Sequence, residues 1–249
     1  MADGDRPDAH QVWGMNIWRR CVQHLEIGAR RPLLVRRERL PHLGLGKRIL
    51  FASDLHLRKD GPRHIVDGIL DIVSQEQPDV ILLGGDLVDW VTGLETLHRL
   101  VGSMARLAPV AAVGGNHDRW IGLARVRDAV LRGGGHWLED EPLEWASGVV
   151  AYGSPEGELI PAACHILCSH DPGSPSERRR YDLVLSGHLH GGQFVFFESR
   201  GRLYPGALLY RWNGLRFQDN GSTLLVSRGV RDTLPLRWNC PREVIVVQL

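Results

Sequence analysis

Short hydrophobic runs alternate with helix-forming segments through the first half of the chain. Three apolar runs bounded by turn-forming residues are typical of buried strands, and they lie at 49–53, 80–83 and 110–113. The segments that follow them predict helices at 62–75, 92–106 and 119–132. This order predicts successive βα units.

The second half of the chain is richer in strands. Short β runs separated by turn signals occur near Trp137, Val149, Ile166, Leu183, Phe194, Leu224 and Val244. The pattern by itself predicts an α/β protein whose second half is mostly β. We expect one domain from residue 48 to residue 249, because the candidate ligands described below span most of this range and a boundary would divide them.

The first 47 residues form a separate arm in this interpretation. Apolar residues recur at intervals of three and four over 11–29, which predicts an amphipathic helix, and 33–40 resembles an exposed edge strand. Residues 11–48 contain nine Lys and Arg against two Glu, a net charge of +7, whereas the whole chain carries +1. The helix either contacts an anionic membrane surface or packs on the core of the protein.

The composition is that of a folded globular protein, with 43% hydrophobic and 24% charged residues. No run of about eighteen uncharged apolar residues occurs, so no transmembrane helix is expected. The four cysteines are scattered and predict free thiols in a reducing compartment. We therefore expect a cytoplasmic protein, peripheral on the inner face of the cell membrane if the arm binds lipid, and no nucleic-acid partner.

The stretch LSGHLHGGQ at 185–193 contains the first candidate site. An apolar run precedes it and two glycines follow the second histidine, so His188 and His190 lie where a strand opens into a tight turn. Both imidazoles can reach the same small volume there. This arrangement suits a metal ion better than a packing role.

Other potential ligands follow four more apolar runs. They are Asp54, His56, Asp86, Asn116 and His170. In an open α/β sheet, ligands bind beyond the carboxyl ends of the strands, so these distant side chains are expected to converge at one edge.

The blocks D-x-H, G-D, G-N-H-D, H and G-H-x-H occur in this order and resemble the calcineurin-like metallophosphoesterase superfamily. The resemblance extends from about residue 48 to the C-terminus and implies a four-layer α/β/β/α sandwich. SGHLHGGQ, YPGALLY at 204–210 and LLVSRGVRDTLPLRW at 224–238 resemble a narrower bacterial branch. That branch contains membrane-associated phosphoesterases and UDP-diacylglucosamine pyrophosphatases of lipid A synthesis.

The resemblance implies a dinuclear metal site. The residues carried over by motif are Asp54, His56 and His190 for one ion, Asn116, His170 and His188 for the other, and Asp86 as the bridge. Two divalent cations are expected, manganese first, although Fe, Zn, Co and Mg also accept mixed nitrogen and oxygen ligands. A metal-bridging hydroxide would attack phosphorus. His117 would act as the catalytic donor, with Asp118 orienting it.

Three arginines are candidates for contacts with substrate phosphate, because a planar guanidinium matches phosphate oxygens. They are Arg119, Arg228 and Arg231, which could equally be ordinary surface residues. Asp89 and Asp171 are interpreted as turn or cap residues.

The sequence thus predicts a metal-dependent phosphohydrolase acting on a phosphoester or pyrophosphate. The basic arm and the branch motifs favour a membrane-proximal or lipid-linked substrate such as UDP-diacylglucosamine. Two alternatives remain open: a general phosphodiesterase acting on soluble nucleotides, and a binding or scaffold module that kept the fold and lost catalysis.

Overall fold

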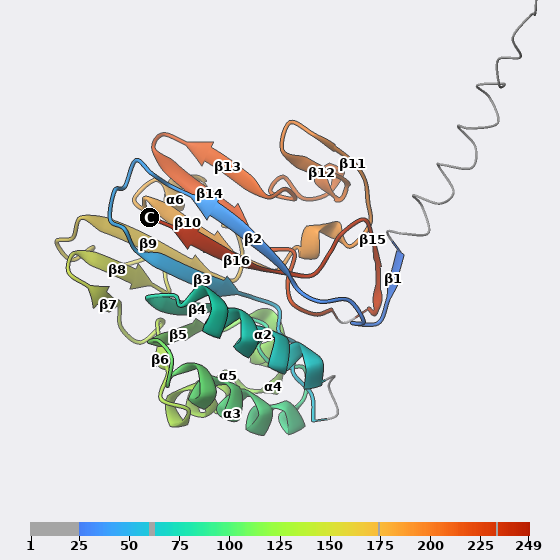
Figure 1. Ribbon diagram of the computed structural model, residues 1–249. Coiled ribbons are helices and arrows are strands. Elements are labelled where there is room, and N and C mark those ends of the chain that lie inside the picture. Colours follow the sequence, from blue (N-terminus) through green and yellow to red (C-terminus); the bar gives the residue numbers. More distant parts are fainter. Residues whose placement is uncertain (1–24, 60–62, 174, 233) are drawn as a thin grey trace, which may run out of the picture.

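The computed structural model describes residues 25–59, 63–173, 175–232 and 234–249. Across these residues, twelve strands form two six-stranded sheets and four more form two two-stranded sheets (Figure 1). The first sheet has the order β2-β16-β3-β4-β5-β6, and β3 to β6 run parallel. Its strands are β2 (Leu34–Arg39), β16 (Glu243–Gln248), β3 (Arg48–Ala52), β4 (Val80–Gly84), β5 (Val110–Val113) and β6 (His136–Trp137).

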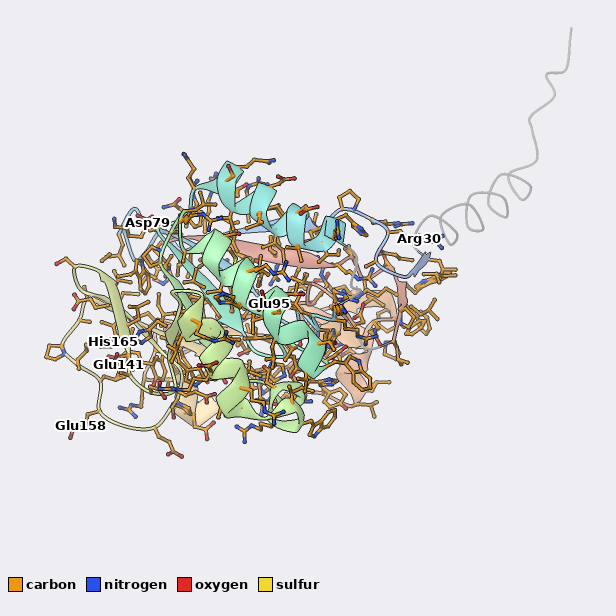
Figure 2. All side chains as sticks on the ribbon, turned by 90° about the horizontal axis from the view of Figure 1, so that it is seen from below. Arg30, Asp79, Glu95, Glu141, Glu158 and His165 are labelled. Atoms are coloured by element: carbon orange, nitrogen blue, oxygen red, sulfur yellow. The ribbon has the colours of Figure 1, made fainter. Side chains whose placement is uncertain are left out.

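Helices cover one face of this sheet, as Figure 2 shows from the helical side. They are α2 (Arg63–Glu76), the short η1 (Val91–Gly93), α3 (Leu94–Met104), α4 (Asn116–Ile121) and α5 (Leu123–Arg132). Leu50 and Leu83 of the sheet belong to the same buried cluster as Ile69, Leu97 and Val130 of the helices. The parallel strands are apolar on both faces because helices cover one side and a second sheet covers the other.

The helix expected at 119–132 begins three residues earlier and is interrupted. Gly122 adopts φ 104° and ψ 101°, outside the helical region, and separates α4 from α5. The pattern of apolar residues did not reveal this break, because a helical glycine and a glycine between two helices look alike in sequence. The earlier start places Asn116 and His117 in the first turn of α4.

The second sheet packs on the opposite face of the first and has the order β13-β14-β10-β9-β8-β7. Its strands are β13 (Arg216–Asp219), β14 (Ser222–Val226), β10 (Leu183–Ser186), β9 (Cys164–Ser169), β8 (Val149–Tyr152) and β7 (Leu143–Ala146). Phe51 and Leu82 share a buried cluster with Ile166, Cys168 and Leu185, which forms the core between the sheets. Burial of alternate residues on the two faces is the arrangement of a β-sandwich.

The expected sandwich of two sheets flanked by helices is confirmed. The outer layer on the second sheet is thin, because it contains the short helix α6 (Pro175–Arg178) and loops. There the Arg178 guanidinium lies 3.9 Å from the centre of the Trp212 ring, which packs against Val184 and Leu224 of the sheet.

The N-terminal arm is part of the fold where the structure describes it. β2 is the expected edge strand and pairs in parallel with β16. The amphipathic helix expected at 11–29 lies mostly outside the described residues, and its last part is not helical, since β1 (Leu25–Ile27) pairs with β15 (Leu236–Trp238). No helix in the described part of the chain is long and apolar enough to cross a bilayer.

Two short 3-10 helices and a β-hairpin lead from β10 to the edge of the second sheet. The chain leaves β10 through η2 (His190–Gly192), forms a hairpin of β11 (Val195–Ser199) and β12 (Arg202–Pro205), and continues through η3 (Gly206–Leu208). The hairpin lies beside β15 at one end of the molecule (Figure 1). Asn213 holds η2 to this hairpin, because its side-chain amide donates to the carbonyls of Gly191 and Leu203.

A buried ion pair ties the C-terminal segment together. Arg237 is fully buried, and its Nε lies 2.8 Å from an oxygen of Asp232. The Asp232 carboxylate also accepts from Arg242 at 2.9 Å and lies 3.1 Å from Nδ1 of His190. Removing one partner of such a pair leaves an uncompensated charge in the interior.

Replacing Asp232 with Ala is therefore expected to lower the free energy of unfolding by about 3–5 kcal/mol, since the buried Arg237 would lose its carboxylate, whereas Arg242 would keep its ion pair with Glu26. Asp128→Ala is the matched control, because Asp128 pairs with Arg132 on the exposed surface of α5. It should cost less than about 1 kcal/mol. Urea unfolding of the wild type and the two variants would measure both losses of stability. Equal losses would contradict the role of Asp232 in a buried ion pair.

Candidate metal centre

The seven predicted ligands converge at one edge of the two sheets. Asp54 and His56 follow β3, Asp86 follows β4, Asn116 follows β5, His170 follows β9, and His188 and His190 follow β10. The carboxyl ends of these strands meet in one cleft, which Asp86, Asn116, His188 and His190 line. The structure therefore brings the seven side chains together at one edge, as the strand topology predicted.

The ligand loops are held in an unusual backbone conformation. Five of the seven residues have positive φ although none is glycine. They are Asp54, His56, Asp86, His188 and His190. The left-handed region costs a non-glycine residue roughly 1–2 kcal/mol. Such strain persists where surrounding structure fixes it and gathers at functional sites.

The first group comprises Asp54, His56 and His190, whose potential ligand atoms all lie within 4.8 Å of one another. Asp54 is fully buried and accepts hydrogen bonds from the Ser53 hydroxyl at 2.6 Å and the backbone N–H of His188 at 3.1 Å. These donors fix the carboxylate. Nε2 of His190 lies 3.5 Å from it.

The second group comprises Asp86, His170 and His188, again within 4.8 Å. Oδ1 of Asn116 lies 2.9 Å from Nε2 of His170 and 3.0 Å from Nδ1 of His188. The two imidazole nitrogens are 3.1 Å apart. Nitrogens that converge on the same point without an intervening side chain are arranged as ligands of one cation.

Asp86 belongs to the second group and also faces His56 of the first. Its carboxylate is 3.4 Å from Nε2 of His170 and 3.9 Å from Nε2 of His56, and it accepts from the backbone N–H of His117 at 2.8 Å. Burial alone would raise the pKa of Asp86, but His170 and the backbone donor outweigh burial and lower it to about 2. The pairing also outweighs the effect of burial on His170 and raises its pKa to about 9.

The residues fit divalent cations. Nε2 of His56 is buried and has no hydrogen-bond partner among the described residues, yet it faces Asp86. A buried polar nitrogen without a partner is costly, and a cation would satisfy it. Carboxylate, amide and imidazole donors together match the ligands of Mn, Fe, Zn, Co or Mg. The Asp and His residues could therefore bind metal.

Asp89, interpreted from the sequence as a turn residue, lies at the centre of a hydrogen-bond network. Its Oδ1 is 2.6 Å from Nδ1 of His56 and 3.0 Å from Nδ1 of His117, and Oδ2 accepts from Arg58 at 2.8 Å. Burial would raise the pKa of Asp89, but His56 and Arg58 hold it well below its usual range. By contrast, Asp171 accepts the N–H of Gly173 at 2.7 Å, as a turn residue does.

The structure places Asp89, and not Asp118, against the His117 ring. Asp118 is fully buried, and its carboxylate accepts backbone N–H bonds from Leu87, Val88 and Gly115. These bonds connect the loop after β4 to the first turn of α4. Asp118 thus positions the loop that contains Asp86, and His117 contacts Asp89 instead.

The three candidate arginines lie in different surroundings. Arg119 lines the part of the cleft beside Asn116, His170 and His188. Arg228 pairs with the buried carboxylate of Glu243, with Nε at 3.0 Å. Arg231 donates to the backbone carbonyl of His56 at 3.0 Å and lines a separate cavity between α2 and α3.

Two residues next to the ligands escaped the sequence interpretation. Asp89 follows Asp86 by three residues in the same loop, and this short spacing was the signal available. Asp232 has no local signal, because its contact with His190 depends on the position of the buried Arg237.

Comparison with known proteins identifies the family. The family model described as calcineurin-like phosphoesterase matches residues 47–192, more than half of the chain. The chain belongs to the calcineurin-like phosphoesterase family. It is a metallophosphoesterase, a hydrolase that acts on phosphoesters.

Bacterial relatives match most of this metallophosphoesterase. An uncharacterised metallophosphoesterase of Aquifex aeolicus is 28% identical over 235 residues, covering 85% of this chain and 88% of the relative. The phosphodiesterase YaeI of Escherichia coli is 27% identical over 238 residues, covering 81% and 82%. The crystal structure of a dimetal phosphatase from Danio rerio covers 82% of this chain and 99% of its own, with 12% identity and a TM-score of 0.48.

Gly115 makes room for Asp86, and its replacement tests the geometry of the centre. A Cβ atom at Gly115 would lie 2.1 Å from Oδ1 of Asp86 and 2.3 Å from its backbone nitrogen. Gly115→Ala is therefore expected to displace Asp86, reduce the metal content of protein purified with manganese, and cost about 1–3 kcal/mol of stability.

Gly68→Ala is the control, because a Cβ there meets nothing within 4 Å in the middle of α2. It should raise stability by about 0.5–1 kcal/mol and leave the metal content unchanged. Elemental analysis and thermal unfolding would provide the two readouts. Full metal content in Gly115→Ala would show that Asp86 is not a ligand.

Proposed function

We propose that the cleft holds two divalent cations, manganese first among them, and hydrolyses a phosphodiester or pyrophosphate. The observation that carries this proposal is that Asp54, His56 and His190 form one group of ligand atoms within 4.8 Å and Asp86, His170 and His188 form another, while Asp86 also lies 3.9 Å from Nε2 of His56. Asp54, His56 and His190 would hold one ion, and Asn116, His170 and His188 the other. When bound, the cations would supply an activated water and neutralise charge on the phosphate oxygens.

The protein residues contribute orientation and a hydrogen-bond donor. Nδ1 of His117 faces Asp89, and the residue lines the cleft with Asp86 and Asn116. In its doubly protonated form, the ring would donate from Nδ1 to Asp89 and from Nε2 to a phosphate oxygen. Arg58, which bonds the other oxygen of Asp89, would hold the carboxylate in this position.

Hydrolysis of bis-p-nitrophenyl phosphate with added manganese tests the proposal. Asp86→Ala should lose the activity because it removes the bridge, and His117→Ala should reduce kcat by roughly a hundredfold to a thousandfold because it removes a donor to the developing charge. His42→Ala is the control, since His42 is exposed and precedes the amino end of β3, whereas the candidate ligands follow the carboxyl ends of the strands. A wild-type protein no faster than Asp86→Ala would favour the scaffold alternative.

We further propose that the substrate is lipid-linked and reached from a membrane surface, with UDP-diacylglucosamine as the specific candidate. Large apolar side chains are exposed on the β11–β12 hairpin and around η3, including Phe196 (66% exposed) and Leu209 (82% exposed). Exposed apolar groups beside arginines suit an anionic bilayer. The supporting arginines in this region are Arg200, Arg202 and Arg211.

The position of the hairpin supports a membrane-facing cleft. It follows directly after η2, which contains His190, and η3 packs close to η2, because a Cβ on Gly192 would lie 3.3 Å from the Cα of Gly206. Leu234, also exposed, lines the same cleft as Asp86. A membrane that covered these apolar groups would lie next to the ligand loops.

Vesicle sedimentation of the full chain tests the membrane surface. Replacing Phe196, Phe197, Leu208 and Leu209 together with Ser should weaken binding to phosphatidylglycerol vesicles by about tenfold or more, because their apolar area would no longer enter the bilayer. Leu107→Ser with Leu131→Ser is the control, since both are exposed on the helical side. Equal sedimentation of both variants would exclude the hairpin as the contact.

A further inference from the structure

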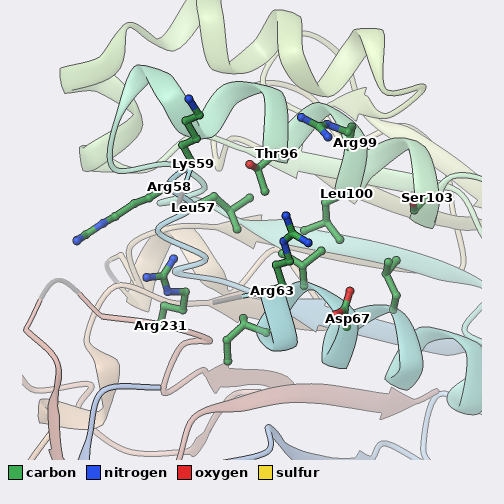
Figure 3. A pocket seen from close by; sticks show the side chains of 13 residues that line it. Leu57, Arg58, Lys59, Arg63, Asp67, Thr96, Arg99, Leu100, Ser103 and Arg231 are labelled. Atoms are coloured by element: carbon green, nitrogen blue, oxygen red, sulfur yellow. The ribbon is translucent and has the colours of Figure 1, made fainter. Parts of the chain in front are cut away.

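A second cavity lies between α2 and α3, outside the Asp and His cleft (Figure 3). Its volume is 580 Å³, which is large enough for an organic ligand. The loop after β3 contributes Leu57, Arg58 and Lys59 to its lining, and the C-terminal segment contributes Arg231. None of the proposed metal ligands lines this cavity.

The cavity is strongly cationic. Among the described residues, five basic side chains line it against one carboxylate, that of Asp67, and Figure 3 labels all six. They are Arg58, Lys59, Arg63, Arg99 and Arg231. Like charges gathered around one opening repel each other, so an anion bound among them would be stabilised.

Most of this charge is not neutralised within the described residues. Lys59, Arg63 and Arg231 have no ion pair there. Arg99 pairs with Glu95 at 3.0 Å, but both side chains are mostly exposed, so the pair is weak. Arg58 is bonded to Asp89. The cavity therefore retains donors for an external anion.

Arg231 is held in place without a carboxylate. It donates to the carbonyl of His56 at 3.0 Å, and its own backbone N–H donates to the carbonyl of Asp54 at 2.9 Å. Burial lowers the pKa of Arg231, and the nearby Arg58 adds to this effect. A guanidinium fixed in this way is ready to bind, because little side-chain freedom remains to be lost.

The floor of the cavity is apolar. Leu57, Ile65 and Leu100 are buried beneath it, and Val66 and Leu70 of α2 are half-buried along its side. A small inorganic anion would leave the exposed parts of Val66 and Leu70 in contact with water, whereas Leu57, Ile65 and Leu100 are each only 2% exposed. A ligand with an alkyl part would cover these exposed parts.

We propose that this cavity binds a phosphate-bearing amphiphile, with the phosphate among the arginines and an alkyl chain along the apolar floor. Guanidinium groups form paired hydrogen bonds with phosphate oxygens, which explains the excess of arginine. The ligand is either one lipid of a bilayer or a free alkyl phosphate, since both present this chemistry. The proposal does not depend on catalysis in the Asp and His cleft.

Titration calorimetry with dodecyl phosphate, below the concentration at which it forms micelles, tests the site. The background is the full chain with Asp86→Ala, so that turnover in the cleft does not contribute heat. Adding Arg63→Gln and Arg99→Gln should weaken binding by about tenfold or more, because two charged donors are removed. Arg125→Gln is the matched control, as Arg125 is exposed on α5, away from the cavity.

Three outcomes decide the proposal. Binding that survives Asp86→Ala and is lost in the double arginine variant supports it, whether or not the wild type hydrolyses phosphoesters. Unchanged affinity in the double arginine variant, with thermal unfolding showing that it is folded, would overturn it. Inorganic phosphate binding as tightly as dodecyl phosphate would overturn the role of the apolar floor.

Vesicles identify the source of the ligand. If the amphiphile is a bilayer lipid, the double arginine variant should sediment less than wild type with phosphatidylglycerol vesicles and equally with phosphatidylcholine vesicles. If sedimentation is unchanged while dodecyl phosphate binding is lost, the site takes a free alkyl phosphate. Either result supports the shared chemistry of phosphate and alkyl chain.

Discussion

The structure depends on the concentration of charged and polar side chains in a small buried volume. Asp54 and His56 are fully buried, and Asp86 is nearly so, at the point where the carboxyl ends of strands from both sheets meet. Carboxylates confined together are unfavourable unless cations accompany them. The imidazoles, together with divalent ions that fit the ligand geometry, would supply this compensation. Much of the surrounding structure can be understood as holding these groups in place.

The backbone around the ligands shows how firmly they are held. Five ligands adopt left-handed conformations, and Gly115 leaves space that any side chain would take from Asp86. Asp118 fixes the same loop through three backbone donors. Because rigid sheets flank the cleft on both sides, this local strain is offset by the packing of the two cores. The centre is therefore preorganised by contacts that do not include substrate.

His190, which follows β10 of the second sheet, connects the C-terminal segment to the Asp and His cleft. Asp232 contacts this histidine and also holds Arg237 and Arg242, so one carboxylate links a ligand to the buried ion pairs of the fold. On the opposite side, Asp89 links His56 and His117 to Arg58, which lines the cationic cavity. The metal centre thus lies between a structural network and a surface that presents unneutralised positive charge.

The sequence by itself determined the strands from 49 to 113 and the seven candidate ligands that follow the strands, because apolar runs and the residues that end them are local properties. The pattern alone predicted only an α/β protein with a β-rich second half, and the four-layer sandwich was implied by the family resemblance of the motifs. The sequence could not determine which aspartate contacts the His117 ring, since Asp118 is the neighbour in sequence whereas Asp89 lies 28 residues away and reaches the ring only through the packing of two loops. Nor could it reveal the burial of Arg237 or the strand β1, because both depend on contacts between segments far apart in the chain. Periodicity records which residues are apolar, whereas the partners of buried charges are decided by tertiary structure.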